Sequence, residues 1–139
     1  MKNMNDIGLL VFRVSVGLLM LIAHGWPKFM KLLEGGEIKF FDPFGVGPFV
    51  SLLLAVLAEL FASLLITLGL FTRLSSVSLI VTMFVAAFLY HADDPFSRQE
   101  KAILFLISYV LLFFTGPGKF SLQTIVEKRS AKFKKFLLG

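Results

Sequence analysis

The 139-residue chain is 57% hydrophobic, has a mean hydropathy of +0.85 and carries formal charge on only 17% of its residues. A soluble domain of this length needs more polar surface, so the composition predicts a single-domain integral membrane protein. The chain has no cysteine, which excludes a dithiol relay or a thiolate metal site built from its own residues. Its net charge of +5 gathers toward the C-terminus, which indicates acidic lipids at the cytoplasmic face rather than nucleic acid.

The first apolar stretch, Ile7–Ala23, has about the length that a bilayer requires of a helix. It carries Arg13 near its middle and is followed by His24, and these two residues fall on one helical face. Gly25 and Pro27 disfavour continuation of the helix, so we expect the span to end there. The alternation of apolar and charged residues over 28–34 then predicts a short helix lying on the membrane surface.

Three further apolar stretches follow, Phe49–Phe71, Leu74–Tyr90 and Ala102–Thr115. The predicted fold is therefore an all-α, four-helix transmembrane bundle with short interfacial helices. Residues 1–118 form the membrane domain, and residues 119–139 form a basic amphipathic cytoplasmic tail, with Lys132, Lys134 and Lys135 beside Phe133, Phe136 and Leu137. Four spans place both termini on one side, and the basic tail predicts that this side is cytoplasmic.

The two formal charges deep within the predicted spans are Arg13 and Glu59. Counted from the cytoplasmic ends of their helices at about 1.5 Å per residue, they lie at similar depths. An unpaired charge in a bilayer is costly, so we expect an Arg13–Glu59 ion pair. Such a pair either locks two helices together or anchors a small polar ligand such as a quinone.

The two histidines, His24 and His91, both fall at the outer end of the predicted bundle. Two imidazoles could bind a metal or haem or relay protons. Alternatively, each is an interfacial residue bonded to backbone or water. Two histidines without a third ligand are a weak signal for a metal. Asp93 or Asp94 could supply a carboxylate, but an Asp-Asp-Pro run is more typical of a turn and helix cap, so no metal site is predicted.

These residues give the chain a resemblance to the DoxX family of small four-helix membrane proteins. The resemblance rests on Arg13 followed by His24-Gly25-x-x-Lys28, on Glu59 before LITLGLFTRL, and on the closing GPGKFSL. The family pattern often has an aspartate after SL, where this chain has Gln123. The resemblance implies a plasma-membrane protein linked to redox metabolism, similar to the membrane subunit of thiosulfate:quinone oxidoreductase.

Together, the residues and the resemblance give a leading hypothesis of a quinone-linked redox subunit that is not a complete enzyme alone. Its candidate ligand-binding seam consists of Arg13, His24, Lys28, Glu59 and His91. Its expected partners are membrane lipids, a soluble or membrane redox protein and further copies of the chain. Two alternatives remain open, a small-molecule or lipid transporter that uses Glu59 and an assembly subunit without a ligand.

Overall fold

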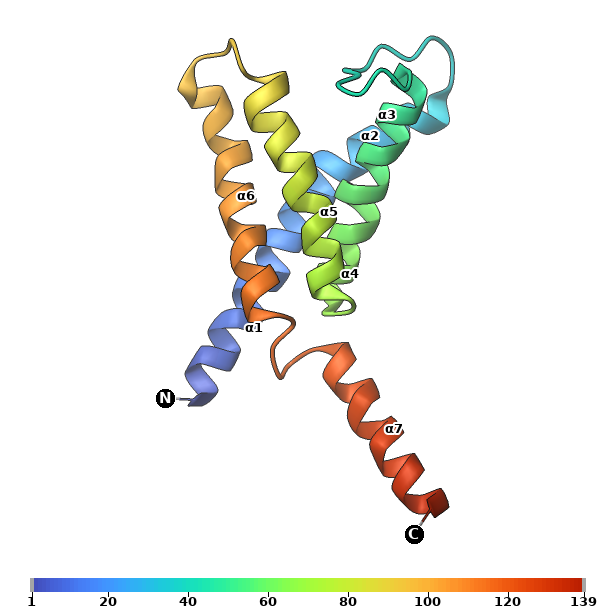
Figure 1. Ribbon diagram of the computed structural model, residues 1–139, viewed down its shortest axis with the longest axis vertical. Coiled ribbons are helices and arrows are strands. Elements are labelled where there is room, and N and C mark those ends of the chain that lie inside the picture. The colour runs from blue at the N-terminus through green and yellow to red at the C-terminus, as the bar shows by residue number, and fades with distance from the viewer. Residues whose placement is uncertain (1, 139) are drawn as a thin grey trace.

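The computed structural model describes the backbone of residues 2–138 and the side chains of residues 3–130. The described chain is all-α (Figure 1). Its helical segments, in which η marks a π-helical turn, are α1 Lys2–Met20, η1 Leu21–Gly25, α2 Trp26–Glu34, α3 Pro48–Val56, η2 Leu57–Ala62, α4 Ser63–Leu68, α5 Thr72–Val85, η3 Ala86–Tyr90, α6 Phe96–Thr115 and α7 Leu122–Leu138.

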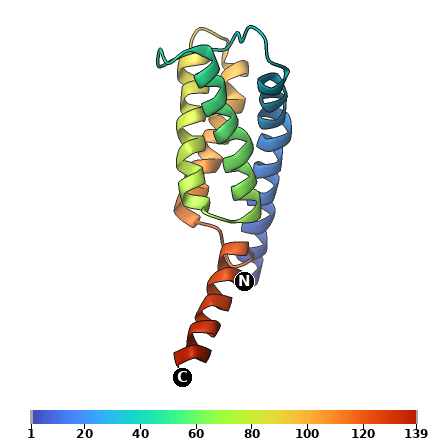
Figure 2. The same cartoon turned by 90° about the vertical axis from the view of Figure 1, so that its right-hand side faces the viewer.

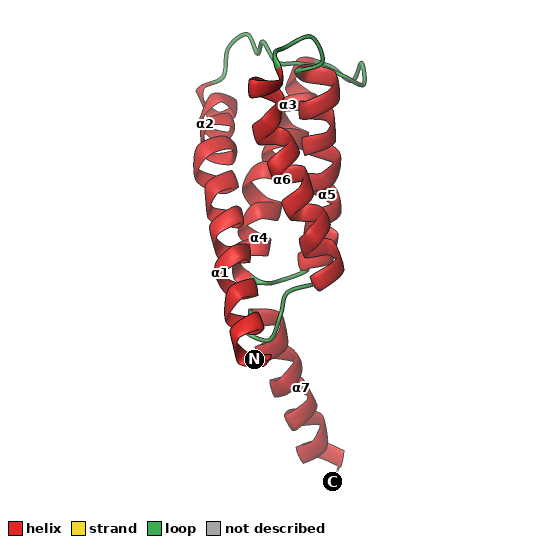
Figure 3. Cartoon of the chain, turned by 90° about the vertical axis from the view of Figure 1, so that its left-hand side faces the viewer, coloured by secondary structure: helices red, strands yellow, loops and turns green. Residues whose placement is uncertain are grey.

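Among the described residues, three helices are long and apolar enough to cross a membrane, at Asn3–Glu34, Pro48–Leu68 and Thr72–Tyr90. Helix α6 has 20 residues, but Arg98, Glu100 and Lys101 lie in its first turns. Its uncharged part, 102–115, covers only about 21 Å at 1.5 Å per residue. Nevertheless, α6 packs along α5 for most of its length and lies beside the three apolar helices (Figures 2 and 3).

The first helix does not end at Gly25-Trp26-Pro27, so the predicted break is wrong. The helix predicted over 28–34 is present within α2, but it continues the first helix instead of forming a separate one. Helical structure continues from α1 through η1 into α2 as one long rod. The amide of Trp26 bonds to the carbonyl of Leu21, five residues back, which is the π-helical pattern. Pro27 then falls in the first turn of α2, where a missing N–H costs little.

The long first helix packs antiparallel against the second one in a fixed register. Gly17 of the first helix lies against Thr67 of the second, and Gly25 lies against Glu59. The two contacts are eight residues apart on each helix, in opposite chain directions. A Cβ added to Gly17 would lie 3.1 Å from the Thr67 amide nitrogen. Small residues at both points allow this close approach, as at many helix contacts in lipid.

The main core is made from four helices. Buried apolar side chains from each of them meet there, namely Val16, Met20, Ala58, Ala62, Ile66, Leu79, Met83, Tyr109 and Leu112. A smaller cluster of Leu52, Val56 and Leu60 packs against Phe29, Leu32, Ile38 and Phe40 from α2 and the following loop. The second cluster holds the loop after α2 over the upper end of the helices.

Helix α6 returns the chain to the end of the molecule where α1 begins, and α7 projects beyond that end (Figure 1). The predicted amphipathic character of the 119–139 tail depends largely on Lys132–Leu137, which lie outside the described side chains. The described part of α7 carries exposed Leu122, Ile125 and Val126.

Candidate functional site

A cavity of about 750 Å³ lies between α2 and α3 on one side and η3 and α6 on the other. These two pairs of segments diverge toward the upper end of the molecule in Figure 1. Four of the five predicted seam residues line this cavity, namely His24, Lys28, Glu59 and His91. Its volume is within the range of about 300–1,000 Å³ typical of small-molecule sites.

The polar centre of the cavity is an ion pair between the Lys28 ammonium and the Glu59 carboxylate. Glu59 is only 3% exposed, whereas a quarter of the Lys28 side chain, 26%, remains accessible. Pairing offsets much of the desolvation cost that an isolated carboxylate would carry in the bilayer. The pair leaves other Glu59 and Lys28 hydrogen-bonding positions free to meet a ligand.

The close approach of the two helices at Gly25 makes this pair possible. A Cβ at Gly25 would lie 2.6 Å from the carbonyl carbon of Glu59 and 2.7 Å from the Leu60 amide nitrogen. Any larger side chain would therefore push the helices apart. Because Lys28 is one turn beyond Gly25, this contact determines whether its ammonium reaches Glu59.

Arg13 is not part of the cavity, and the predicted Arg13–Glu59 ion pair is wrong. The Arg13 guanidinium, 2% exposed, donates to the carbonyl oxygens of Pro117 at 2.8 Å and Phe120 at 2.9 Å. It lies against Gly69, ten residues and thus about 15 Å of helix from Glu59. The prediction counted both residues from the cytoplasmic ends of their helices and assumed that these ends are level. In the structure Arg13 is instead level with Gly69, at the end of the second helix.

His24 faces the cavity and packs edge-on against Phe105, with the ring centroids 5.7 Å apart. It has no hydrogen-bond partner among the described side chains, so its ring nitrogens are available to a ligand. Phe105 in turn stacks on Tyr109, which ties the cavity wall to the core.

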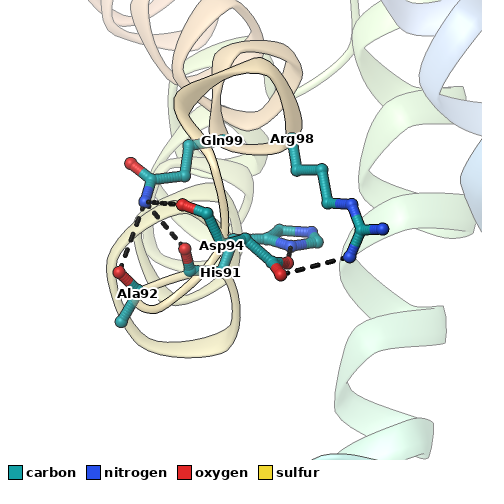
Figure 4. Close-up of polar contacts among 5 residues, drawn as sticks. All are labelled: His91, Ala92, Asp94, Arg98 and Gln99. Atoms are coloured by element: carbon teal, nitrogen blue, oxygen red, sulfur yellow. Dashed lines mark hydrogen bonds and ion pairs between the residues drawn. The ribbon is translucent and has the colours of Figure 1, made fainter.

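His91 belongs to a compact polar cluster at the turn between η3 and α6 (Figure 4). Its Nδ1 lies 2.6 Å from Oδ2 of Asp94, and Arg98 donates to the other carboxylate oxygen at 3.2 Å. The hydrogen bond with His91 lowers the pKa of the Asp94 carboxyl, and the charge of Arg98 lowers it further. Gln99 donates to the backbone carbonyls of His91 and Asp94 at 2.7 and 3.2 Å. This cluster fixes the upper wall of the cavity.

The opposite wall includes the loop that follows α2. Asp42 organises this loop by accepting hydrogen bonds from the amides of Val46 and Gly47 and from the Ser51 hydroxyl. The Ser51 bond lowers the pKa of the Asp42 carboxyl. Phe41 of the same loop contacts Tyr90 of η3, with ring centroids 5.3 Å apart, so an aromatic contact bridges the two sides of the cavity.

Several cavity residues were not predicted from the sequence. They are basic or aromatic and come from three separate segments, α2, the loop after it and α6: Lys31, Lys39, Arg98, Lys101, Phe40, Phe41, Phe44 and Phe105. The spacing of Lys28 and Lys31, three residues apart in one helix, was the available signal for part of this set. Within the described residues, no three His, Asp or Glu side chains lie close enough together to hold a metal ion.

All three π-helical turns contribute to the cavity. His24 lies in η1, Glu59 in η2, and Ala86 and Tyr90 in η3. A π-helical turn inserts one residue into an α-helix and changes the direction of the following side chains, and such turns are frequent at functional sites. Their convergence marks this cavity as the candidate ligand site.

Apolar helices of membrane-crossing length define an integral membrane protein. The cavity between their upper ends is its candidate ligand site. The comparisons place the protein more narrowly. The DoxX family model matches residues 8–92, and the chain belongs to the DoxX family, as the resemblance implied.

Similar proteins include the inner membrane protein YqjF of Escherichia coli, 29% identical over 93% of this chain and 99% of that protein. The inner membrane protein YphA of the same organism is 31% identical over 83% of this chain and 87% of its own length. An uncharacterised Haemophilus influenzae protein is 32% identical over 79% of this chain and 84% of its own length. No solved structure matches the chain.

Proposed function

We propose that this protein is a membrane subunit that binds a small amphipathic molecule of the quinone class in the cavity around Lys28, Glu59 and His24. The observation that carries the proposal is the buried Lys28–Glu59 pair at the centre of a largely apolar, aromatic-lined cavity. A quinone needs hydrogen-bond partners for its ring oxygens and flat apolar walls for its ring, and this cavity has both. When bound, it would supply two-electron redox chemistry.

The chain's own residues would bind and orient the ligand and exchange protons. The Lys28 ammonium is a hydrogen-bond donor, Glu59 an acceptor, and the His24 ring can do either. We propose that a partner protein delivers the electrons. The chain would then act as a subunit of an oxidoreductase rather than as a complete enzyme.

The transporter alternative is less favoured by the same ion pair. A carrier that couples protons through Glu59 needs this carboxylate to change its protonation during transport. In this structure the carboxylate is instead held in an ion pair with the Lys28 ammonium. Loss of proton-coupled uptake into proteoliposomes on Glu59→Gln would nevertheless favour a carrier.

We further propose a placement in the plasma membrane with four spans and both termini in the cytoplasm. The inner membrane relatives and the apolar helices support the location. Helix α6 runs back along α5 to the end where α1 begins, which supports a fourth span. Lys2, Arg73 and the six basic residues after Gly118 gather at that end, which the positive-inside rule favours as cytoplasmic.

Quinone binding is tested on the full chain in neutral detergent by equilibrium binding of a decyl-substituted benzoquinone. We expect saturable binding that weakens about tenfold, or about 1.4 kcal/mol, in Lys28→Gln. His24→Phe, which keeps the edge-on ring contact with Phe105, should also weaken it. The control Lys119→Gln, at the opposite end, should bind as the wild type does. Non-saturable binding, or equal binding by all variants, would refute the proposal.

A further inference from the structure

The cavity is bordered by a group of exposed cations that the quinone proposal does not use. This cationic rim consists of Lys31, Lys39, Arg98 and Lys101, all of which line the cavity. Lys31 lies in the last turn of α2, Lys39 in the next loop, and Arg98 and Lys101 in the first turns of α6. The loop between α2 and α3 and the turn before α6 both lie at the upper end of the molecule in Figure 1. The cationic rim therefore borders the upper end of the cavity.

Among the described side chains, no carboxylate forms an ion pair with Lys31, Lys39 or Lys101. Glu59 is paired with Lys28, Asp94 with His91 and Arg98, and Asp42 binds backbone amides and Ser51. The other acids of this end, Glu34, Glu37, Asp93 and Glu100, form no ion pair within the described side chains. Lys39 and Lys101 therefore face the cavity without a carboxylate partner.

The position of these lysines is not explained by membrane topology. If the chain ends are cytoplasmic, the rim lies on the opposite side, where the positive-inside rule disfavours Lys and Arg in short loops. A cavity bordered by charge of one sign with low-dielectric walls concentrates the field and attracts an oppositely charged ligand. The rim is thus better accounted for by ligand recognition than by membrane insertion.

Below the rim the cavity wall is mainly apolar. Leu54, Val81, Met83, Val85 and Phe105 face it beneath the charged border. A ligand that fits both parts carries an acidic head and a hydrocarbon body. We infer that the cationic rim is a subsite for the head of an amphiphilic anion, a phosphate or carboxylate on a hydrocarbon chain, whose apolar part enters the cavity from the outer membrane surface.

This inference uses the same cavity as the proposed function, but it depends on different residues and requires no electron transfer. The test uses the full chain in neutral detergent and compares three probes: dodecyl phosphate, dodecanol and inorganic phosphate. Native mass spectrometry measures the bound fraction of the first two, and the third serves as a competitor. The variant is Lys39→Gln/Lys101→Gln, both exposed and remote from the core, and the matched control is Lys119→Gln/Lys128→Gln at the opposite end.

We expect dodecyl phosphate to bind saturably, and at least tenfold more tightly than dodecanol. The rim variant should lose about tenfold in affinity, the control variant should lose none, and added salt should weaken binding to the wild type. Equal binding of dodecanol, or equal loss in the control, would overturn the inference. Inorganic phosphate that competes as strongly as dodecyl phosphate would overturn the role of the hydrocarbon chain.

The same variants separate this inference from the proposed function. Decyl-benzoquinone binding should depend on Lys28 and not on the Lys39/Lys101 pair. Binding of dodecyl phosphate without quinone binding would refute the proposed function and leave the rim subsite supported. The reverse result would refute the subsite alone.

Discussion

The backbone of Gly25 packs against the backbone of Glu59, so that a Cβ added at Gly25 would lie 2.6 Å from the Glu59 carbonyl carbon. This contact lies between two π-helical turns, η1 and η2. It allows Lys28, one turn further along, to reach the Glu59 carboxylate. The geometry of the candidate site therefore depends on a residue that has no side chain to contribute.

Gly25→Ala should disrupt this packing and the cavity together. The added methyl would meet the Glu59 backbone, and overpacking of this kind costs about 1–3 kcal/mol of unfolding free energy. We expect a lower melting temperature in detergent and weaker decyl-benzoquinone binding. The control is Gly8→Ala, since a Cβ there would meet nothing within 4 Å. Similar behaviour of both variants would contradict the proposed role of the contact.

Breaking the Lys28–Glu59 pair on one side should be costlier than removing it entirely. Lys28→Met leaves a buried carboxylate unpaired, and we expect a loss of about 2–3 kcal/mol. This is below the values for fully buried pairs, because 26% of the Lys28 side chain is accessible. The double variant Lys28→Met/Glu59→Leu should be more stable than the sum of the single effects predicts. Unfolding in sodium dodecyl sulfate measures the stability of Lys28→Met, Glu59→Leu and the double variant. If the two single effects simply add in the double variant, the two side chains are not coupled.

Arg13 should act on the segment between α6 and α7 rather than on the cavity. Arg13→Met removes the donors to the Pro117 and Phe120 carbonyls, at an expected cost of about 3–6 kcal/mol for two charged hydrogen bonds. Limited digestion with trypsin should then cleave faster after Lys119, while ligand binding is retained. Asp6→Asn, which removes only the exposed ion pair with Lys119, should leave the cleavage rate nearly unchanged. Loss of quinone binding with an unchanged cleavage rate would argue for a role at the cavity instead.

The His91–Asp94–Arg98 cluster should make stability dependent on acidic pH. The pKa of Asp94 is lowered in the folded protein, so its stabilising contribution is present above the unfolded value of about 3.9. It is lost as the pH falls from that value through the folded pKa. Asp94→Asn should therefore melt at a lower temperature than the wild type at pH 7, and the difference should shrink toward pH 3. Asp93→Asn, beside the cluster but outside its ion pairs, should show no such difference.

The apolar segments were predictable from the sequence, but their relative depth was not. The predicted stretches 49–71 and 74–90 lie close to the observed helices at Pro48–Leu68 and Thr72–Tyr90. The depth of Arg13 relative to Glu59 depends on where Gly17 and Gly25 meet the second helix. That register is a property of two packed surfaces and does not follow from the periodicity of either helix.

The sequence also identified most of the candidate site while assigning one residue to it wrongly. His24, Lys28, Glu59 and His91 converge, and Arg13 lies elsewhere. The cationic rim was missed because its members come from a helix end, a loop and a second helix start. Such residues come together only when the connections are placed in space.

The π-helical turns have a consequence for how this site can change among relatives. Each turn contains one residue more than a regular α-helix would need. Deleting a single residue from η1 would restore an ordinary helix and rotate everything beyond it by about 100°, which would turn Lys28 away from Glu59. A relative could therefore keep both residues and still lose the pair through a one-residue gap. In an alignment of such relatives, the position of insertions and deletions within these helices would report on the site as directly as the identity of its side chains.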